Sequence, residues 1–365
     1  MASFDEVLKD CTKLGTKIPT SEYLENGKYP IIDQGQSDIA GYHDSDSGLF
    51  ENVPAIVFGD HTRVVKYVDK PCFLGADGVK LLCPVDKDIN CKYLFYQLSY
   101  ADIPNTGYNR HFKWVKALNF KIPSSDEQNH VVEVLDKVTE LISLRKQQLA
   151  RLDELVKARF VEMFGDLVVG DKIQTSKKKI GEIASVTKLA GFEFTKYIQY
   201  KEHGDIIMLR GLNCKQGKLI LDDVKWIDRE TSDLLPRSKL YYGDILMTYA
   251  GTIGDVAMVD ENDKYHLAPN VAKVSINNKK AYNPIFLMYL FLYSNDYIMR
   301  FASQVAQASI NMEKIRNFEY YFPDVTFQNQ FATFVARVDQ QKQTVQQSLE
   351  KLELMKKALM QEYFG

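Results

Sequence analysis

Residues 321–365 repeat residues 121–165 without a gap, at a distance of 200 positions. The first copy is KIPSSDEQNHVVEVLDKVTELISLRKQQLARLDELVKARFVEMFG, and the second is YFPDVTFQNQFATFVARVDQQKQTVQQSLEKLELMKKALMQEYFG. Identical residues include Pro123 and Pro323, Gln128 and Gln328, and Gly165 and Gly365. A repeat of this kind predicts a molecule with two matched halves, and it favours a partner that itself has two halves.

Each copy has the pattern of one long helix. Residues 126–163 contain neither glycine nor proline, and apolar side chains recur there at intervals of three and four. Proline precedes each copy, Ser124, Ser125, Asp126 and Thr326 suit a helix start, and the closing glycines suit a helix end. A helix of about 38 residues is roughly 57 Å long.

A single helix with such an apolar seam would expose it to water, so the two helices are expected to pair. A two-fold relation between the halves would make them antiparallel. The residues expected at their interface are Val131, Val138, Leu152, Leu155, Phe331, Val338, Val345, Leu352 and Met355. In the alternative arrangement, each helix packs on its own globular domain instead.

The remaining segments have a mixed pattern of short apolar runs and polar, glycine-bearing loops, and each ends in a helical pattern. The run KYLFYQLSY in the first segment resembles IFLMYLFLY in the second. The prediction is an α+β protein: two mixed α/β domains separated by two long antiparallel helices that form a coiled coil with pseudo-two-fold symmetry. The predicted bounds are 1–122 and 166–322 for the domains, and 123–165 and 323–365 for the helices.

Composition restricts the class of protein. No run of 18 apolar residues occurs, and the first residues, MASFDEVLKDC, do not have the pattern of a signal peptide, so a cytoplasmic protein without a membrane span is expected. The net charge is –2, which is unusual for a protein that binds DNA by itself. A DNA-binding role therefore requires a locally basic face or a partner that contacts the phosphates.

No catalytic or metal-binding motif is found in the sequence. Phosphate-binding glycine loops, the nucleophile elbow, paired histidines and the Glu-x-Lys of common nucleases are all missing. The five scattered cysteines form no Cys-x-x-Cys pair, so buried free thiols are expected and no metal site. An enzyme with an unrecognised site is the less favoured alternative.

Polar loops with aromatic and basic residues are the candidate binding sites, because such side chains contact base edges and phosphates. They occur at matching places in both halves, in GDHTR and NTGYNRHFKW of the first and in MLRGLNCKQGK, MTYAGTIG and QASINMEK of the second. Each could also be an ordinary turn. The candidate DNA-binding residues are His61, Thr62, Arg63, Tyr108, Asn109, Arg110, His111, Lys113, Trp114, Arg210, Asn213, Lys215, Lys218, Tyr249, Thr252, Ser309, Asn311 and Lys314.

Over nearly its whole length the chain resembles the specificity subunit of type I restriction-modification enzymes (HsdS). The resemblance is carried by FKIPSSDEQ and YYFPDVTFQ before the helices, by GDILMTYAGTIGDVAMV, and by YPIIDQGQSDIAGYHD, PAIVFGDHTR and GADGVKLL in the first half. The second proline of the family's helix-start motif is replaced by Ser125 and Val325. Each motif is loose alone, but their order and the doubled helix make the likeness specific.

The resemblance implies a non-catalytic subunit that recognises double-stranded DNA. Each globular domain would be a target-recognition domain for one half of an asymmetric, split target, and the helices would set the distance between the halves. Two methylation subunits that bind S-adenosylmethionine would dock mainly around the helices, and restriction subunits would supply cleavage with ATP and Mg. The chain itself would hold no cofactor. A coiled-coil adaptor that binds proteins without DNA specificity is the rival interpretation.

Overall fold

The computed structural model describes residues 1–75, 77–173, 175–303 and 308–365. One residue of GADGVKLL and the first residue of QASINMEK lie outside these ranges. By their contacts the described residues form two compact units. Unit 1 comprises Met1–Gln147 and Val345–Gly365, and unit 2 comprises Gln148–Thr344.

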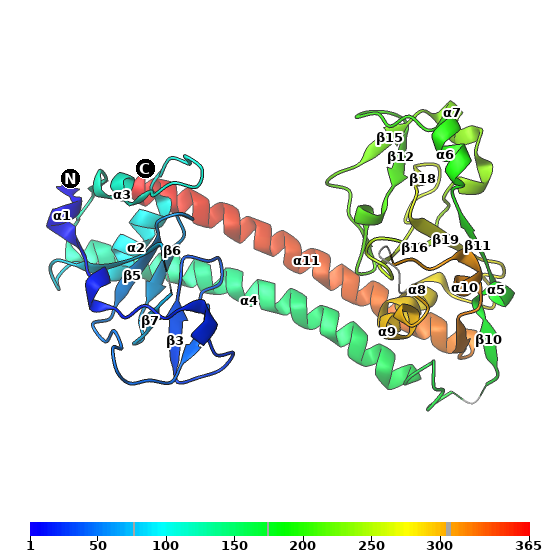
Figure 1. The fold of residues 1–365 in the computed structure, drawn as a ribbon, viewed down its shortest axis with the longest axis horizontal. Coiled ribbons are helices and arrows are strands. Elements are labelled where there is room, and N and C mark those ends of the chain that lie inside the picture. Colours follow the sequence, from blue (N-terminus) through cyan, green and yellow to red (C-terminus); the bar gives the residue numbers. More distant parts are fainter. Residues whose placement is uncertain (76, 174, 304–307) are drawn as a thin grey trace. The chain divides into compact units, whose positions relative to one another are not determined.

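Unit 1 contains a globular domain with two main sheets (Figure 1). An antiparallel four-stranded sheet has the order β2 (Leu8–Asp10), β8 (Val79–Pro84), β5 (Ala55–Gly59) and β6 (Val65–Val68). A three-stranded sheet has the order β4 (Gly41–His43), β3 (Tyr29–Ile32) and β7 (Phe73–Leu74), with β3 and β7 parallel. The remaining elements are β1 (Ala2–Ser3), paired with β9 (Asn119–Phe120), and the helices α1 (Phe4–Val7), α2 (Cys91–Tyr100) and α3 (Phe112–Lys116).

The globular domain of unit 2 repeats this topology. Its four-stranded sheet has the order β11 (Ala184–Lys188), β19 (Val271–Ile276), β16 (Ile245–Thr248) and β17 (Val256–Met258). Its three-stranded sheet has the order β15 (Lys225–Ile227), β12 (Ile206–Leu209) and β18 (Tyr265–Leu267), with β12 and β18 parallel. The pair β10 (Lys177–Lys179) and β20 (Glu319–Tyr321) and the helices α5 (Ile180–Ile183), α8 (Pro284–Tyr293) and α10 (Met312–Arg316) complete the correspondence.

Unit 2 also has elements without a counterpart in the first domain. They include the hairpin of β13 (Cys214–Lys215) and β14 (Lys218–Leu219), and the helices α6 (Gly191–Tyr197), α7 (Arg229–Asp233) and α9 (Asn295–Met299). The two domains therefore share a framework and differ in their loops. The predicted fold class, mixed α/β domains with two long helices, is confirmed.

The long helices are α4 (Ser125–Phe164) and α11 (Val325–Phe364), each of 40 residues. At the start of α4, the Glu127 carboxylate accepts from the Ser124 N–H at 3.1 Å and the Ser124 hydroxyl accepts from the Glu127 N–H at 3.4 Å, the two bonds of a capping box. Asp324, rather than the expected Thr326, caps α11, because its carboxylate accepts from the Thr326 N–H at 2.8 Å. Gly165 ends α4 with a φ of 64°, a left-handed conformation that costs glycine little.

In each unit the two helix segments run antiparallel. In unit 1, Lys146 of α4 pairs with Glu353 of α11 at 3.1 Å, while Leu135 and Phe364 share the hydrophobic core. In unit 2, the ring of Phe160 on α4 lies 5.3 Å from that of Phe331 on α11. In both units these segments also pack on the globular domain, so helix pairing and packing on a domain, stated as alternatives, occur together.

The buried face of the helices differs from the expected one at two positions. Leu155 is 46% exposed and Met355 is 44% exposed, and neither belongs to a buried interface. Val156 and Leu349, at 1% and 6% exposure, are buried instead. The same stripe of buried and half-buried positions occurs on both helices 200 residues apart: 128, 131, 135, 138, 142, 145, 149, 152, 156, 160 and 164, and the corresponding positions 328 to 364.

Candidate nucleic-acid interface

In unit 1, the loop between β5 and β6 is fastened to the loop that precedes α3. The backbone N–H of His111 donates to the carbonyl of Asp60 at 2.8 Å, and the N–H of Phe112 donates to the Asp60 carboxylate at 2.7 Å. The ring of His61 stacks on that of Tyr108, with centroids 4.7 Å apart and planes 10° apart. Predicted candidates from two distant stretches of sequence therefore form one surface.

His111 belongs to the frame of this surface rather than to its exposed part. Its side chain is 0% exposed, and Nδ1 lies 2.9 Å from the Asp60 carbonyl, which can only accept. The other ring nitrogen, Nε2, lies 3.3 Å from the Thr106 hydroxyl. The prediction that His111 contacts DNA directly is corrected, because its side chain is buried and its hydrogen bonds hold the two loops together.

Thr62 and Arg63 also have structural partners. The Thr62 hydroxyl donates to the carbonyl of Gln34 at 2.6 Å, and Arg63 donates through Nη1 to the carbonyl of Ile103 at 3.1 Å. Arg63 has a φ of 63°, and this left-handed conformation costs a side chain of its size roughly 1 kcal/mol. These contacts fix the shape of the turn, while Tyr108, Asn109, Arg110, Lys113 and Trp114 remain on the surface.

The residues Asp33 and Gln34 were missed by the search for candidates. The Gln34 amide oxygen accepts from the His61 N–H at 3.2 Å, and the Asp33 carboxylate pairs at 3.2 Å with Lys66, whose side chain is buried. Both follow strand β3, and the available signal was the polar run after its apolar residues in YPIIDQGQSD. They support the loop between β5 and β6 from the neighbouring sheet.

Unit 2 contains the same joint between loops. The N–H of Ile310, one residue before the position that corresponds to His111, donates to the carbonyl of Tyr249 at 2.8 Å, and so joins the loop after β16 to the loop before α10. Ala250 and Ser309 form an isolated bridge beside it, and the Lys188 ammonium lies 5.4 Å from the centroid of the Tyr249 ring. The candidates Tyr249, Thr252 and Ser309 are thus brought together.

Other candidates in unit 2 are engaged within the domain. Asn213 is 0% exposed and donates to the carbonyls of Ile220 and Asp223, at 2.7 and 2.8 Å, so its predicted role in DNA contact is corrected to a structural one. Arg210 pairs with the Asp223 carboxylate at 2.8 Å. The exposed Lys215 and Lys218 lie on the hairpin of β13 and β14.

Helix α10 uses two further candidates for its own stability. The Asn311 side chain caps the helix by accepting from the N–H of Lys314 at 2.8 Å. The Lys314 ammonium donates to the carbonyl of Phe301 at 2.8 Å. Of the remaining candidates in unit 2, Thr252, Lys215 and Lys218 are exposed, and Tyr249 and Ser309 are half-buried.

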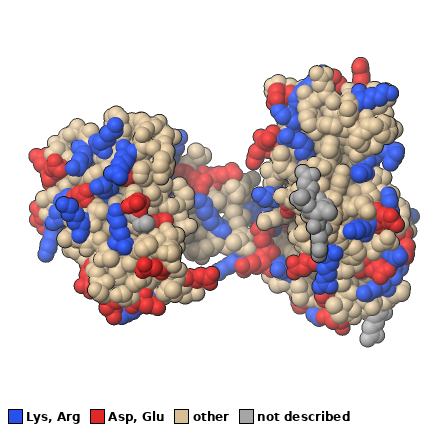
Figure 2. All heavy atoms as spheres, in the orientation of Figure 1, with Lys and Arg blue, Asp and Glu red and all other residues tan. Residues whose placement is uncertain are grey.

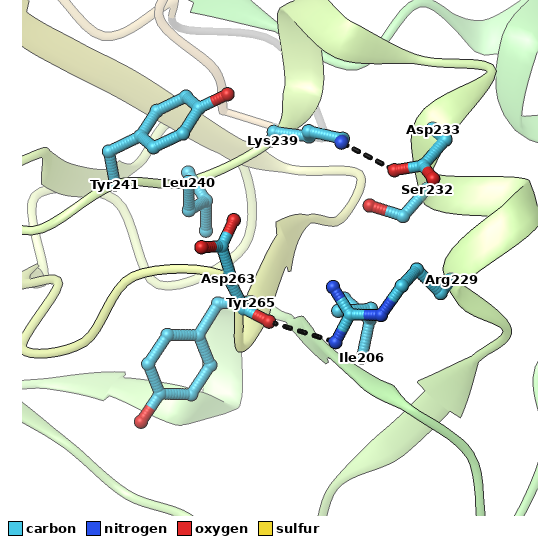
Figure 3. A pocket seen from close by; sticks show the side chains of 9 residues that line it. All are labelled: Ile206, Arg229, Ser232, Asp233, Lys239, Leu240, Tyr241, Asp263 and Tyr265. Carbon is cyan, nitrogen blue, oxygen red and sulfur yellow. Dashed lines mark hydrogen bonds and ion pairs between the residues drawn. The ribbon is translucent and has the colours of Figure 1, made fainter.

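A small polar hollow in unit 2 is lined by paired charges (Figure 3). Lys239 points toward Asp233, and Arg229 points toward the carbonyl of Asp263. The hydroxyl of Ser232, which also lines the hollow, lies 3.0 Å from Nδ1 of His266, a pairing that resembles a nucleophile and its base. Both side chains are buried, at 3% and 0% exposure, and burial lowers the pKa of His266 to about 4, so the pair is poorly suited to catalysis.

The cysteines are all buried as free thiols. Burial raises the pKa of Cys72, Cys91 and Cys214 to about 12, which keeps these thiols protonated at neutral pH. Within the described ranges, no group of three or more histidine, cysteine or carboxylate side chains is arranged to hold a metal ion. None of the helices in those ranges is both long enough and apolar enough to cross a bilayer.

The repeated domain is also found by comparison with known proteins. The family described as the type I restriction modification DNA specificity domain matches residues 5–154 and again residues 174–354. The chain belongs to this family, that of HsdS. The two matches correspond to the two halves predicted from the repeat.

Curated HsdS relatives are distant in sequence. The EcoBI specificity subunit of a type I restriction enzyme from Escherichia coli is 26% identical over 244 residues, which cover 60% of this chain and 50% of that protein. A second specificity subunit from the same organism is 24% identical over 151 residues, 36% of this chain and 37% of the relative. The chain thus aligns with about half the length, or less, of these relatives.

Solved HsdS structures share the fold. The S subunit of a type I restriction-modification system from M. genitalium covers 100% of this chain and 95% of its own, with a TM-score of 0.58 and 17% identity. A chain from a study of complex assembly and conformational transition of the type I R-M system covers 98% and 94%, with a TM-score of 0.57 and 13% identity. At these identities the likeness concerns the fold alone.

Proposed function

We propose that this HsdS chain recognises a split, asymmetric DNA target, with one globular domain for each half. The observation that carries the proposal is a backbone hydrogen bond between two polar loops, which is found in each domain. The bond from His111 to Asp60 and the bond from Ile310 to Tyr249 are both 2.8 Å long and connect equivalent loops. The exposed side chains on the two joints differ, which favours two different half-sites in the major groove.

The long helices are proposed to set the distance between the half-sites. Each has 40 residues, which corresponds to about 60 Å at 1.5 Å per residue. One turn of DNA is roughly 34–36 Å, so two recognition surfaces on such helices can match half-sites separated by an unread spacer. A continuous helix has no hinge, which favours one fixed spacing.

We also propose that the chemistry belongs to partner subunits. Two methylation subunits with S-adenosylmethionine and restriction subunits with ATP and Mg would act in the cytoplasm at the sites this chain selects. The net charge of –2 supports a partner that contributes phosphate contacts. Exposed apolar residues on the helices, such as Leu141, Leu144 and Leu354, offer surface for the methylation subunits.

Methylome sequencing of a host that expresses the chain with its methylation subunits tests the proposal. The expected result is methylation at one asymmetric motif with two specified parts and a spacer of constant length. Substituting Tyr249 and Thr252 by other residues should alter only one of the two specified parts of the motif. Sequence-independent methylation, or none when the complex assembles normally, would support the adaptor interpretation instead.

A further inference from the structure

Helix α3 and the loop before it carry basic side chains next to Tyr108 in the first domain. Arg110, Lys113 and Lys116 follow one another at every third position and are exposed. Lys80, on the adjacent strand β8, directs its ammonium to within 4.8 Å of the Phe112 ring centroid, and the Lys116 ammonium lies 5.5 Å from the same centroid. Figure 2 shows basic side chains gathered on this domain, in the part where Figure 1 places α3.

Most of this charge is not neutralised. Lys80 pairs with Asp10 at 3.1 Å, whereas Arg110, Lys113 and Lys116 have no carboxylate partner among the residues that the structure describes. Lys113 and Lys116, three positions apart on the short helix α3, repel one another and destabilise it slightly. Exposed cations that gain nothing from each other are typical of a surface that meets an anionic ligand.

The equivalent helix of the second domain lacks this property. At the positions 200 residues further along, Ile310 is buried, Glu313 replaces Lys113, and Arg316 donates to the carbonyl of Val186 at 2.7 Å. The Lys314 ammonium is bound to the carbonyl of Phe301, as described above. Helices α3 and α10 occupy corresponding places in two domains of the same topology. The two domains therefore differ in the charge on this helix and not in its position in the fold.

We propose that α3 of the first domain is a phosphate-contacting surface, and that α10 has no such role. Arg110, Lys113 and Lys116 would lie along the backbone of the DNA whose bases meet the loop of Tyr108, with Lys80 behind them. The inference rests on the proposed function and adds an asymmetry to it: the two domains hold the DNA backbone unequally. Phosphate contacts of this kind increase affinity without selecting sequence.

The test compares Lys113→Gln/Lys116→Gln with the unmodified chain, each assembled with its methylation subunits. Glutamine keeps most of the side-chain length and removes the charge. The matched control is Lys70→Gln/Lys87→Gln, which removes two exposed lysines elsewhere in the same domain. Binding is measured on a duplex with the methylated motif and on a scrambled duplex of equal length, at several salt concentrations.

Affinity for both duplexes should fall by a similar factor, about ten-fold, and the slope of log affinity against log salt should decrease by about 2, since each phosphate contact contributes about 0.9. The control should keep the original slope. An unchanged slope in the α3 variant would overturn the inference. So would a loss confined to the motif duplex, which would make α3 a base-recognising element.

Two further measurements separate the remaining outcomes. If the α3 variant no longer assembles with the methylation subunits in size-exclusion chromatography, the surface binds protein and the inference is wrong. Thermal unfolding of the variant should match that of the control, which excludes misfolding as the cause. If the unmodified complex itself does not distinguish the motif from the scrambled duplex, the proposed function fails, whatever α3 does.

Discussion

Gln128 accepts a hydrogen bond at Oε1 from the backbone N–H of Asn90, over 2.9 Å. Its amide nitrogen donates to the carbonyl of Pro123, also at 2.9 Å. One side chain thus ties the bend before α4 to the start of α2, whose first N–H groups the Asn90 side chain caps. Gln328 makes the same two bonds to Asn283 and Pro323 in unit 2, at 2.9 and 2.8 Å.

The two hydrogen bonds of the Gln128 side chain should be important for the stability of unit 1. Gln128 is 2% exposed, and Gln128→Ala leaves the N–H of Asn90 and the carbonyl of Pro123, both in part-buried hydrogen bonds, without their partner. We expect a loss of about 1–3 kcal/mol in the free energy of unfolding of unit 1, measured by urea denaturation. Gln147→Ala, at an exposed position of the same helix, is the control and should change little. Equal effects of the two variants would contradict this role.

The aromatic contact between the helices in unit 2 should contribute more to the free energy of unfolding than the Gln128 hydrogen bonds do. Phe160 is 3% exposed and packs against Phe331, Phe164 and Phe286. Phe160→Ala should lower the unfolding free energy by about 3–5 kcal/mol, because it removes a large buried side chain and leaves a cavity. Leu155→Ala on the same helix should cost less, about 1 kcal/mol or below, as Leu155 is about half exposed. A large loss of unfolding free energy in Leu155→Ala would instead support its predicted place at the helix interface.

Acid should destabilise unit 2 through His266. Its pKa is about 4 when folded, below its ordinary value of 6.5, because of burial and then the nearby Lys273 and Lys239. The unfolded chain therefore binds more protons between these values, and stability present above pH 6.5 falls by up to about 3 kcal/mol as the pH approaches 4. Urea denaturation at a series of pH values measures this, and His266→Gln should flatten the dependence.

Two residues of the loop before α3, Tyr108 and His111, should respond differently to substitution by alanine. Tyr108 is 88% exposed, so Tyr108→Ala should leave the unfolding free energy within about 0.5 kcal/mol while weakening target binding about ten-fold. His111→Ala should cost about 1–3 kcal/mol in stability, since it removes the contacts of the buried ring with Asp60 in the other loop and with Thr106 in its own. Calorimetry and DNA-binding titration distinguish the two. Intact binding by Tyr108→Ala would remove it from the interface.

A matched deletion should test the proposed spacing. Removing residues 142–148 and 342–348 together preserves the seven-residue pattern and shortens each helix by about 10 Å. Methylation of the original motif should be lost, because its half-sites no longer match, while the bases specified within each half stay the same. Methylome sequencing gives both results, and an unchanged spacer would contradict a spacing role for the helices.

The sequence was most informative where one physical cause acts on many residues. The helices follow from a long periodic pattern and a shared offset, and both begin and end within a few residues of the prediction. Leu155 and Met355 were misplaced because the buried stripe passes through positions 152 and 156, and 352 and 356, which leaves both residues just outside it. The buried stripe also includes the half-buried Arg145 and Lys342, whose long side chains can cover a seam.

The candidate interface was harder to predict, because a polar residue can either contact a ligand or hold a loop in place. His111 and Asn213 resemble ligand contacts in sequence, yet each holds a loop by hydrogen bonds to backbone atoms. Asp33 and Gln34 were missed because their contribution depends on sheet topology, which places the end of β3 beside the loop after β5. Such pairings are not visible from local pattern.

Unit 1 is formed by two stretches of the chain that lie on either side of unit 2, and this has a consequence during protein synthesis. Its hydrophobic core contains both Phe4 and Phe364, whereas unit 2 is formed by the continuous stretch 148–344. On the ribosome, every residue of unit 2 is made before the last helix segment of unit 1 is available. The domain translated first is therefore the last to be completed, and until then the faces of Tyr93 and Tyr100 that contact Phe364 stay open to chaperones or to misassembly.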